Sequence, residues 1–171
     1  KSAAEIPAFD AASKRAFVVN AQSGKLDVLD LSDPKNPKKV GEVNGAAVLT
    51  NGEVNSVAVK NGLVAIAIQA KPKTDAGRIA IYQAADLKLL GSAPVGALPD
   101  MLTFSPDGKH VLVANEGEAA GDNNPEGSVS VIDMSNGLVS ATVQTGGTYE
   151  LGKHWCVMSE IKSSRSRTSR R

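Results

Sequence analysis

The sequence predicts an all-β fold, a β-propeller-type repeat of four-stranded antiparallel blades with about three blades in an incomplete ring. Three observations predict it. Apolar strand-like segments of one type begin at Phe17, Val64 and Val111, so a spacing of 47 residues occurs twice. Short runs rich in Val, Ile and Leu alternate with clusters of Gly, Pro, Asn and Asp. Asn-Gly and Asp-Gly dipeptides separate pairs of these runs and supply the positive φ of tight hairpin turns.

Each unit contains four expected strands. Unit one, residues 1–45, has them at Ile6–Phe9, Ala16–Asn20, Lys25–Leu31 and Lys39–Val43. Unit two, residues 46–95, has them at Val54–Val59, Leu63–Gln69, Arg78–Tyr82 and Leu87–Ala93, with Asn61-Gly62 in its first turn. Unit three, residues 96–145, has them at Met101–Phe104, His110–Asn115, Ser128–Asp133 and Leu138–Gln144, with Asp107-Gly108 in its first turn. Four short strands in about 45–50 residues are typical of a propeller blade, whereas a β-sandwich does not need self-similar units.

The number of units sets a further expectation. Propellers usually contain about four to eight blades. Three blades do not close a ring, so we expect the chain to be a fragment of a larger propeller. An open ring leaves N–H and C=O groups unpaired at its strand edges, which predicts self-association through those edges.

The charge of the chain is distributed unevenly. Residues 162–171 hold five of the 19 Lys and Arg side chains and none of the 18 acids. The remaining 14 bases and 18 acids give the body a net charge of −4, which does not suit a nucleic-acid partner. No apolar run reaches the roughly 18 residues of a membrane span, so none is expected. A single cysteine, Cys156, excludes an internal disulfide.

Residues 146–171 depart from the repeat, because the strand alternation stops at about Gly146. The segment Tyr149–Arg171 holds the only Trp, the only Cys and a run of Ser and Arg. One interpretation is a disordered basic tail that binds RNA or another anion. The other, which we favour, is a segment foreign to the fold, such as a frame-shifted end, since the composition changes where a new blade should begin.

Three polar residues share one position of the repeat. Superposing the units on the ends of their first strands places Glu5, Asn55 and Asp100 together, each four residues earlier. The superposed strand ends are Phe9, Val59 and Phe104. Such a set predicts a ring at the mouth of a central channel, where a protein or small-molecule ligand binds. The alternative is that strand starts are commonly polar and exposed.

The segment 116–127 is the most unusual loop. It carries the carboxylates of Glu116, Glu118, Asp122 and Glu126, two Asn amides and three glycines. Ca²⁺ takes six to eight oxygen ligands from flexible loops of this kind, so Ca²⁺ or another divalent cation is the one candidate cofactor. The spacing does not match an EF-hand loop, and a solvated acidic loop is the alternative. No catalytic residue can be named, because nucleophile-elbow, phosphate-loop and zinc-binding patterns are absent from the sequence.

Several stretches carry a family resemblance. They are the segments Gly52–Val59, Ala97–Lys109, Val111–Glu118 and Pro125–Asp133. Together they resemble the N-terminal part of the choice-of-anchor I proteins, whose members are labelled alkaline-phosphatase-like or mesenchyme-specific cell-surface-glycoprotein-like. The resemblance covers about residues 4–143 and ends where another blade should follow. It implies a secreted propeller with further blades, at the cell surface, in the periplasm or outside the cell. No apolar leader precedes the first expected strand, so we expect no signal peptide within this chain.

Two functions from different classes follow. The first is an extracytoplasmic binding or surface-interaction module, supported by the resemblance. The second is a metal-dependent phosphoric-ester hydrolase, in which a cation held by carboxylates at the channel mouth would polarise phosphate and lower the pKa of bound water.

Overall fold

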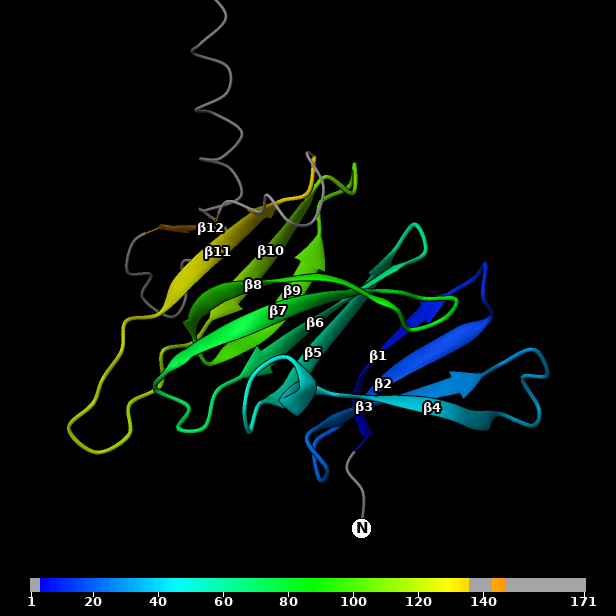
Figure 1. Cartoon of the computed structure of the whole chain (residues 1–171), viewed down its shortest axis with the longest axis horizontal. Coiled ribbons are helices and arrows are strands. Elements are labelled where there is room, and N and C mark those ends of the chain that lie inside the picture. The colour runs from blue at the N-terminus through cyan, green and yellow to red at the C-terminus, as the bar shows by residue number, and fades with distance from the viewer. Residues whose placement is uncertain (1–3, 136–142, 147–171) are drawn as a thin grey trace, which may run out of the picture.

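The fold was obtained as a computed structural model, which describes residues 4–135 and 143–146 (Figure 1). It contains three four-stranded antiparallel sheets, each built from four consecutive strands. We call these sheets blades 1, 2 and 3. They lie side by side without closing into a ring, with blade 2 in the middle. The predicted all-β fold of three four-stranded units is confirmed.

The strands begin and end close to the predicted positions. Blade 1 contains β1 (Ala4–Asp10), β2 (Arg15–Asn20), β3 (Lys25–Asp30) and β4 (Lys38–Asn44), followed by the 3-10 turn η1 (Gly45–Ala47). Blade 2 contains β5 (Glu53–Lys60), β6 (Leu63–Gln69), β7 (Ala76–Gln83) and β8 (Leu89–Ala97). Blade 3 contains β9 (Pro99–Phe104), β10 (His110–Asn115), β11 (Ser128–Asp133) and β12 (Val143–Gly146).

Two strands of this set differ most from the prediction. β8 runs to Ala97 and so passes the expected end of unit two. It tolerates Pro94 because an outer strand needs no ladder N–H at that residue. β12 ends two residues later than expected, and positions 138–142 of the predicted strand lie outside the described residues.

The predicted hairpin turns are confirmed. Asn61 and Gly62 both have positive φ, 51° and 75°, and form the two-residue turn between β5 and β6. Gly108 has a φ of 71° in the turn between β9 and β10. A positive φ costs glycine nothing and asparagine little, so these residues allow the chain to reverse in a short loop.

Two apolar cores hold the blades together. Blade 1 and blade 2 share one, which includes Phe17, Val19, Leu26 and Val28 on one side and Val57, Val64, Ile66 and Tyr82 on the other. Blade 2 and blade 3 share the second, which includes Ala65, Ala67, Ile79 and Ile81 on one side and Leu102, Val111, Val113 and Ile132 on the other. Blade 2 is therefore covered on both faces, which explains why β6 is almost continuously apolar.

The equivalent positions of the blades differ by one residue from the predicted match. Phe9, Val59 and Phe104 occupy one place in the ladder, where they pair with Ala16, Val64 and Val111 respectively. The true intervals between the second strands are thus 48 and then 47 residues. Matching Phe17 to Val64 was wrong, because a slip of one residue moves a side chain to the opposite face of a sheet.

The match was made on the apolar residues of the second strands themselves, and not by counting through the turns, which have four residues in blade 1, Ala11–Lys14, and two in blade 2. Because β2 is apolar on both faces, its own pattern did not reveal the slip.

Candidate functional site

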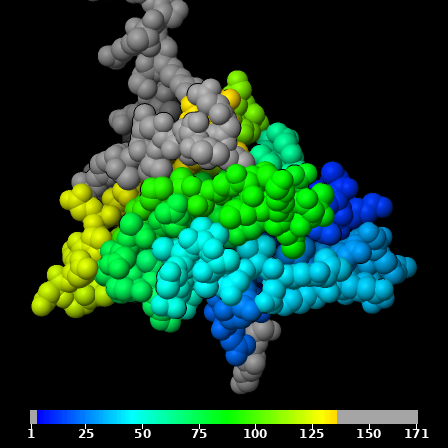
Figure 2. Space-filling view, in the orientation of Figure 1, coloured from blue at the N-terminus to red at the C-terminus, as the bar shows by residue number. Residues whose placement is uncertain are grey.

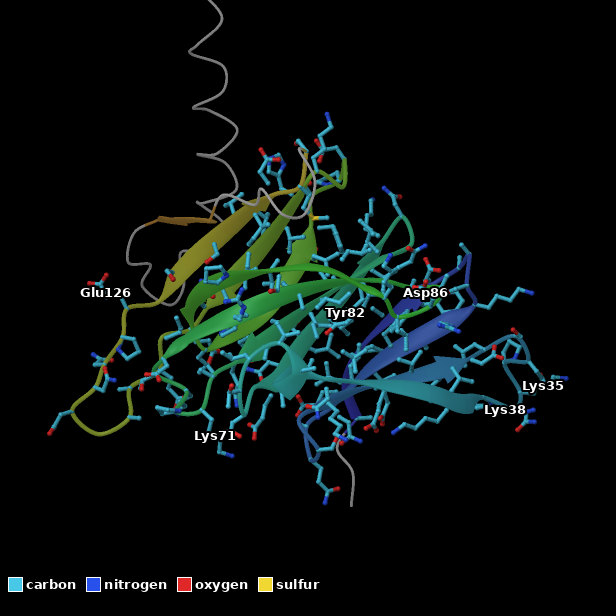
Figure 3. The ribbon with its side chains drawn as sticks, viewed as in Figure 1. Lys35, Lys38, Lys71, Tyr82, Asp86 and Glu126 are labelled. Carbon is cyan, nitrogen blue, oxygen red and sulfur yellow. The ribbon has the colours of Figure 1, made fainter. Side chains whose placement is uncertain are left out.

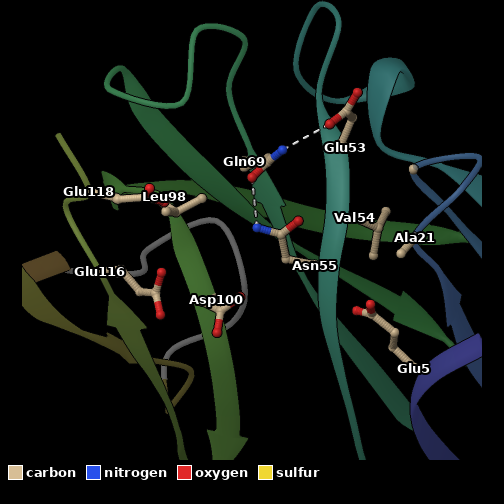
Figure 4. Close-up of a pocket in the computed structure, with 11 residues that line it drawn as sticks. Glu5, Ala21, Glu53, Val54, Asn55, Gln69, Leu98, Asp100, Glu116 and Glu118 are labelled. Carbon is tan, nitrogen blue, oxygen red and sulfur yellow. Dashed lines mark hydrogen bonds between the residues drawn. The ribbon is translucent and has the colours of Figure 1, made fainter. Parts of the chain in front are cut away.

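The first strands of the three blades begin around one cavity. β5 lies between β1 and β9, so the three strands run next to one another through the middle of the molecule. Glu5 of β1, Asn55 of β5 and Asp100 of β9 all line a cavity of about 280 Å³ at the start of these strands (Figure 4). We call this cavity the mouth. The structure thus brings the three sequence-predicted ring residues together, and ligand binding by them stays a prediction.

The same backbone feature places each of these residues. In β5, Val54 and Ser56 pair with consecutive residues of β6, so Asn55 is an extra residue in a β-bulge. Asp100 is the extra residue of an equivalent bulge in β9. β1 also contains one extra residue between Ala4 and Pro7, the segment that holds Glu5. A bulge turns a side chain away from the regular alternation of a strand, and here it recurs in all three blades.

A chain of hydrogen bonds crosses the floor of the mouth. The side-chain amide of Asn55 donates to Gln69 Oε1 at 3.0 Å and to the carbonyl of Pro99 at 3.2 Å. Gln69 Nε2 donates to Glu53 Oε2 at 2.8 Å. Lys71 Nζ in turn lies 3.2 Å from Glu53 Oε1. These contacts fix the orientation of Asn55 and join blade 2 to the first strand of blade 3.

The mouth is strongly acidic. Five carboxylates line it, those of Glu5, Glu53, Asp100, Glu116 and Glu118, and no described lysine, arginine or histidine is among its lining residues. Two lysines pair with two of these acids: Lys71 with Glu53, and Lys73 with Glu118 at 2.6 Å. Within the described part of the chain, no hydrogen bond or ion pair reaches the other three carboxylates, those of Glu5, Asp100 and Glu116.

Glu116 shows the effect of this crowding. Its backbone N–H donates to the carbonyl of Leu98 at 2.9 Å, which holds the residue beside β9. Glu116 is exposed on the whole, but the partial burial of its carboxyl raises the pKa of that group above its ordinary value, and the charges of Asp100 and Glu118 raise it further, while Lys73 opposes the shift. A positive charge in the mouth would relieve this repulsion.

The four acids predicted as metal ligands fall into two separate pairs. Glu116 and Glu118, at the base of the loop, line the mouth. Asp122 and Glu126 do not line it, and Glu126 lies on the loop that projects beyond the edge of blade 3 (Figure 3). Backbone hydrogen bonds between Ala120 and Asn123 close the tip of this loop. Among the described residues, no group of three or more His, Cys, Asp or Glu side chains is arranged to hold a metal ion. Cation binding therefore stays a prediction.

Glu53 and Gln69 were not identified from the sequence. They stand opposite each other in the β5–β6 ladder. Gln69 is the one polar residue at the end of an otherwise apolar strand, which was the available signal.

In the described ranges of the chain, the structure contains no helix long and apolar enough to cross a membrane.

Solved structures of other proteins show the same fold. A protein from Lactobacillus plantarum is similar with a TM-score of 0.61 and 14% identity, covering 86% of this chain and 43% of that one. The periplasmic gluconolactonase of Pseudomonas aeruginosa is similar with a TM-score of 0.55 and 19% identity, covering 83% of this chain and 37% of that one. At these identities the likeness shows the fold alone.

One relative and one family match in sequence. The mesenchyme-specific cell surface glycoprotein of Strongylocentrotus purpuratus is 31% identical over 160 residues, which cover 82% of this chain and 20% of that protein. The chain thus spans about a fifth of the length of this relative. The choice-of-anchor I domain matches residues 5–160, a range that contains the described strands except for Ala4, the first residue of β1, and runs into the segment set apart at 146–171. By this match the chain belongs to the choice-of-anchor I domain family.

Proposed function

We propose that the chain is a surface-associated, extracytoplasmic binding module and that its ligand binds in the mouth. The family and the cell surface glycoprotein relative support the surface role. The observation that carries the choice of site is the recurrent bulge, which turns Glu5, Asn55 and Asp100 into one cavity from three different blades. Bulges are common next to functional sites because they redirect side chains without ending a strand.

The ligand carries a positive charge. Three of the five carboxylates in the mouth have no lysine partner among the described residues. The pKa of Glu116 is raised, first by burial and then by the charges of Asp100 and Glu118. The carboxylates of the mouth attract a cation or an ammonium group and repel an anion. Carboxylate and amide oxygens also suit Ca²⁺. The ligand is therefore a divalent cation or a protonated amine.

Calorimetric titration with calcium chloride and, separately, with spermidine distinguishes these two sources of charge. Asp100→Asn removes one carboxylate of the mouth and is expected to weaken binding about tenfold, the equivalent of about 1.4 kcal/mol. Asp122→Asn is the matched control, because it makes the same change on the projecting loop. Weakening by Asp122→Asn alone would place the cation in the loop, and no heat with either probe would end the proposal.

The hydrolase remains the second candidate. The observation that favours it is the proximity of Asp100 and Glu116, where one carboxyl keeps its proton to a higher pH than usual beside a second carboxylate. The same preparation, incubated with p-nitrophenyl phosphate with and without calcium chloride, tests this candidate. Turnover that Asp100→Asn abolishes and Asp122→Asn preserves would favour the hydrolase over the binding module.

A further inference from the structure

A second cavity lies beside the mouth, at the junction of blades 1 and 2. It has a volume of about 460 Å³, and Glu53 lines both cavities. The turn between β2 and β3 contributes Gly24 to the mouth and Ser23 to the second cavity. In Figure 2 this turn, in blue, lies next to the cyan connection between β4 and β5 at the lower edge of the molecule. We call this second space the side cavity.

The turn of blade 1 packs closely on the shared residue. The N–H of Val54 donates to the carbonyl of Gly24 at 2.9 Å, which holds the turn against β5. Gly24 has a φ of 64°, and a Cβ at this position would come within 2.8 Å of Glu53 Cγ. A residue other than glycine would therefore be strained and crowded here. Backbone contacts between two blades thus set the position of Glu53 between the two cavities.

The side cavity has the opposite charge balance to the mouth. Lys25 and Lys71 line it, and Glu53 is the one carboxylate among its described lining residues. Lys25 pairs with Glu42, which lies outside the cavity lining. The mouth, in contrast, is lined by five carboxylates and by no described lysine, arginine or histidine. The two neighbouring cavities therefore favour ligand groups of opposite charge.

The neutral side chains of the side cavity add hydrogen-bond donors. Asn44 Oδ1 accepts a hydrogen bond from the N–H of Ala46 at 3.0 Å, so Asn44 Nδ2 is left without a partner in the described chain. The side-chain amide of Asn51 has no hydrogen-bond partner among the described residues either. Two ammonium groups and two amides can donate to several oxygen atoms at once. A tetrahedral oxyanion, a sulfate or phosphate group, offers the acceptors that such a set of donors needs.

One ion pair connects the two cavities. Lys71 Nζ lies 3.2 Å from Glu53 Oε1, and the Lys71 side chain is 69% exposed, at the same edge of the molecule as the side cavity (Figure 3). Exposed ion pairs are weak, so Lys71 can turn toward an anion in the side cavity at little cost. Glu53 would then keep its hydrogen bond from Gln69 but lose its lysine partner. An anion in the side cavity therefore adds an unpaired carboxylate to the mouth.

We propose that the side cavity binds a tetrahedral oxyanion, and that this anion and the cation of the mouth strengthen each other's binding through Lys71 and Glu53. The coupling rests on the proposed function of the mouth, whereas the oxyanion site does not. It acts equally in both directions, because a cation that engages Glu53 releases Lys71 for the anion. A ligand that carries both charges, an amine joined to a sulfate or phosphate ester, would occupy both cavities at once.

Titration of the full chain with sodium sulfate, against sodium chloride of equal ionic strength, tests the oxyanion site by amide NMR signals. Lys71→Gln should weaken sulfate binding about tenfold, because it removes one of the two ammonium donors. Lys73→Gln is the matched control, since Lys73 also pairs with an acid of the mouth but does not line the side cavity. A parallel titration with inorganic phosphate shows which of the two anions the cavity prefers. No saturable binding of either anion, or equal weakening by both variants, would overturn the site.

The coupling is measured by calorimetric titrations with calcium chloride and with spermidine, each with and without saturating sulfate. The wild type should bind its cation about fivefold more tightly with sulfate, which is the lower end of the usual coupling between two sites. In Lys71→Gln, Glu53 is already unpaired, so sulfate should leave the cation affinity unchanged. An unchanged affinity in the wild type would overturn the coupling. Sulfate binding by a protein that binds neither cation would support the oxyanion site and overturn the coupling together with the proposed function.

Discussion

The side-chain amide of Asn55 donates a hydrogen bond to the backbone carbonyl of Pro99, 3.2 Å away, and so links the first strands of blades 2 and 3. The same amide donates to Gln69 within its own blade. Asn55 is therefore the one ring residue with a structural role as well as a place in the mouth. Glu5 and Asp100 reach no such partner among the described residues.

Asn55→Asp should destabilise the protein by about 1–3 kcal/mol at neutral pH, because it removes both donors and leaves acceptors facing a carboxylate. Urea unfolding monitored by far-ultraviolet circular dichroism measures this loss of stability. Asn124→Asp makes the same change on the exposed loop and should have little effect. Equal losses for the two variants would show that the link to Pro99 contributes nothing.

Glu116→Gln should stabilise the protein at neutral pH and have no effect in acid. The folded pKa of Glu116 lies above its unfolded value, so between the two values the folded state holds more protons and stability falls as pH rises. The destabilisation caused by the charge of Glu116 is absent below the unfolded pKa of this residue and complete above its folded pKa. Thermal melts of wild type and variant across this range measure it, with Glu126→Gln as control. A stabilisation that persists in acid would contradict the electrostatic cause.

Gly77→Ala should cost about 1–3 kcal/mol of stability through overpacking. A Cβ at position 77 would lie 2.5 Å from Pro99 Cδ and 2.6 Å from the carbonyl oxygen of Ile68, and neither a proline ring nor a backbone can yield easily. Gly121→Ala is the comparison, because position 121 has open space and only its φ of 62° opposes a side chain. Chemical denaturation should show the larger loss for Gly77→Ala, and the reverse order would refute the close approach of β7 to β9.

Tyr82 should make the protein sensitive to alkali. Burial in the core between blades 1 and 2 raises the pKa of its hydroxyl above the ordinary 10.0 (Figure 3). The contribution of the protonated Tyr82 hydroxyl to stability is fully present below the pKa that Tyr82 has in the unfolded chain. It is lost as pH rises through the folded pKa, since Tyr82 releases its proton at a lower pH in the unfolded chain than in the folded one. Tyr82→Phe should therefore flatten the fall in melting temperature above about pH 10. An unchanged alkaline slope would show that other groups cause it.

The repeat was predictable because its signal lies within single strands. Counting back four residues from Phe9, Val59 and Phe104 never leaves the first strand, so the ring residues were found despite the bulges. The match of Phe17 to Val64 compared two second strands, β2 and β6, that are apolar on both faces, so it slipped by one residue without breaking the apolar pattern. Alternation thus determines which residues are equivalent only where one face of the strand is polar.

The partners of the ring residues were hidden by the same bulges. Counting outward from the two-residue turn at Asn61-Gly62 would pair Glu53 with Ala70. The extra residue Asn55 shifts the pairing by one, so Glu53 meets Gln69. Composition likewise revealed the acidity of loop 116–127. It did not reveal that Glu116 and Glu118 line the mouth while Asp122 and Glu126 do not. Side-chain direction in a loop depends on backbone turns that the residue types alone do not determine.

The bulge in each first strand has an evolutionary consequence. An extra residue takes no regular place in the ladder, so replacing it leaves the pairing of its neighbours unchanged. Glu5 and Asp100 have no hydrogen-bonded partner to lose within the described chain, and both can vary while the blade around them stays constant. Blades 1 and 3 therefore each contribute one replaceable position to a shared pocket, whereas blade 2 contributes Asn55, which also links the blades. A new ligand preference can arise by single substitutions at the two replaceable positions without loss of a hydrogen bond.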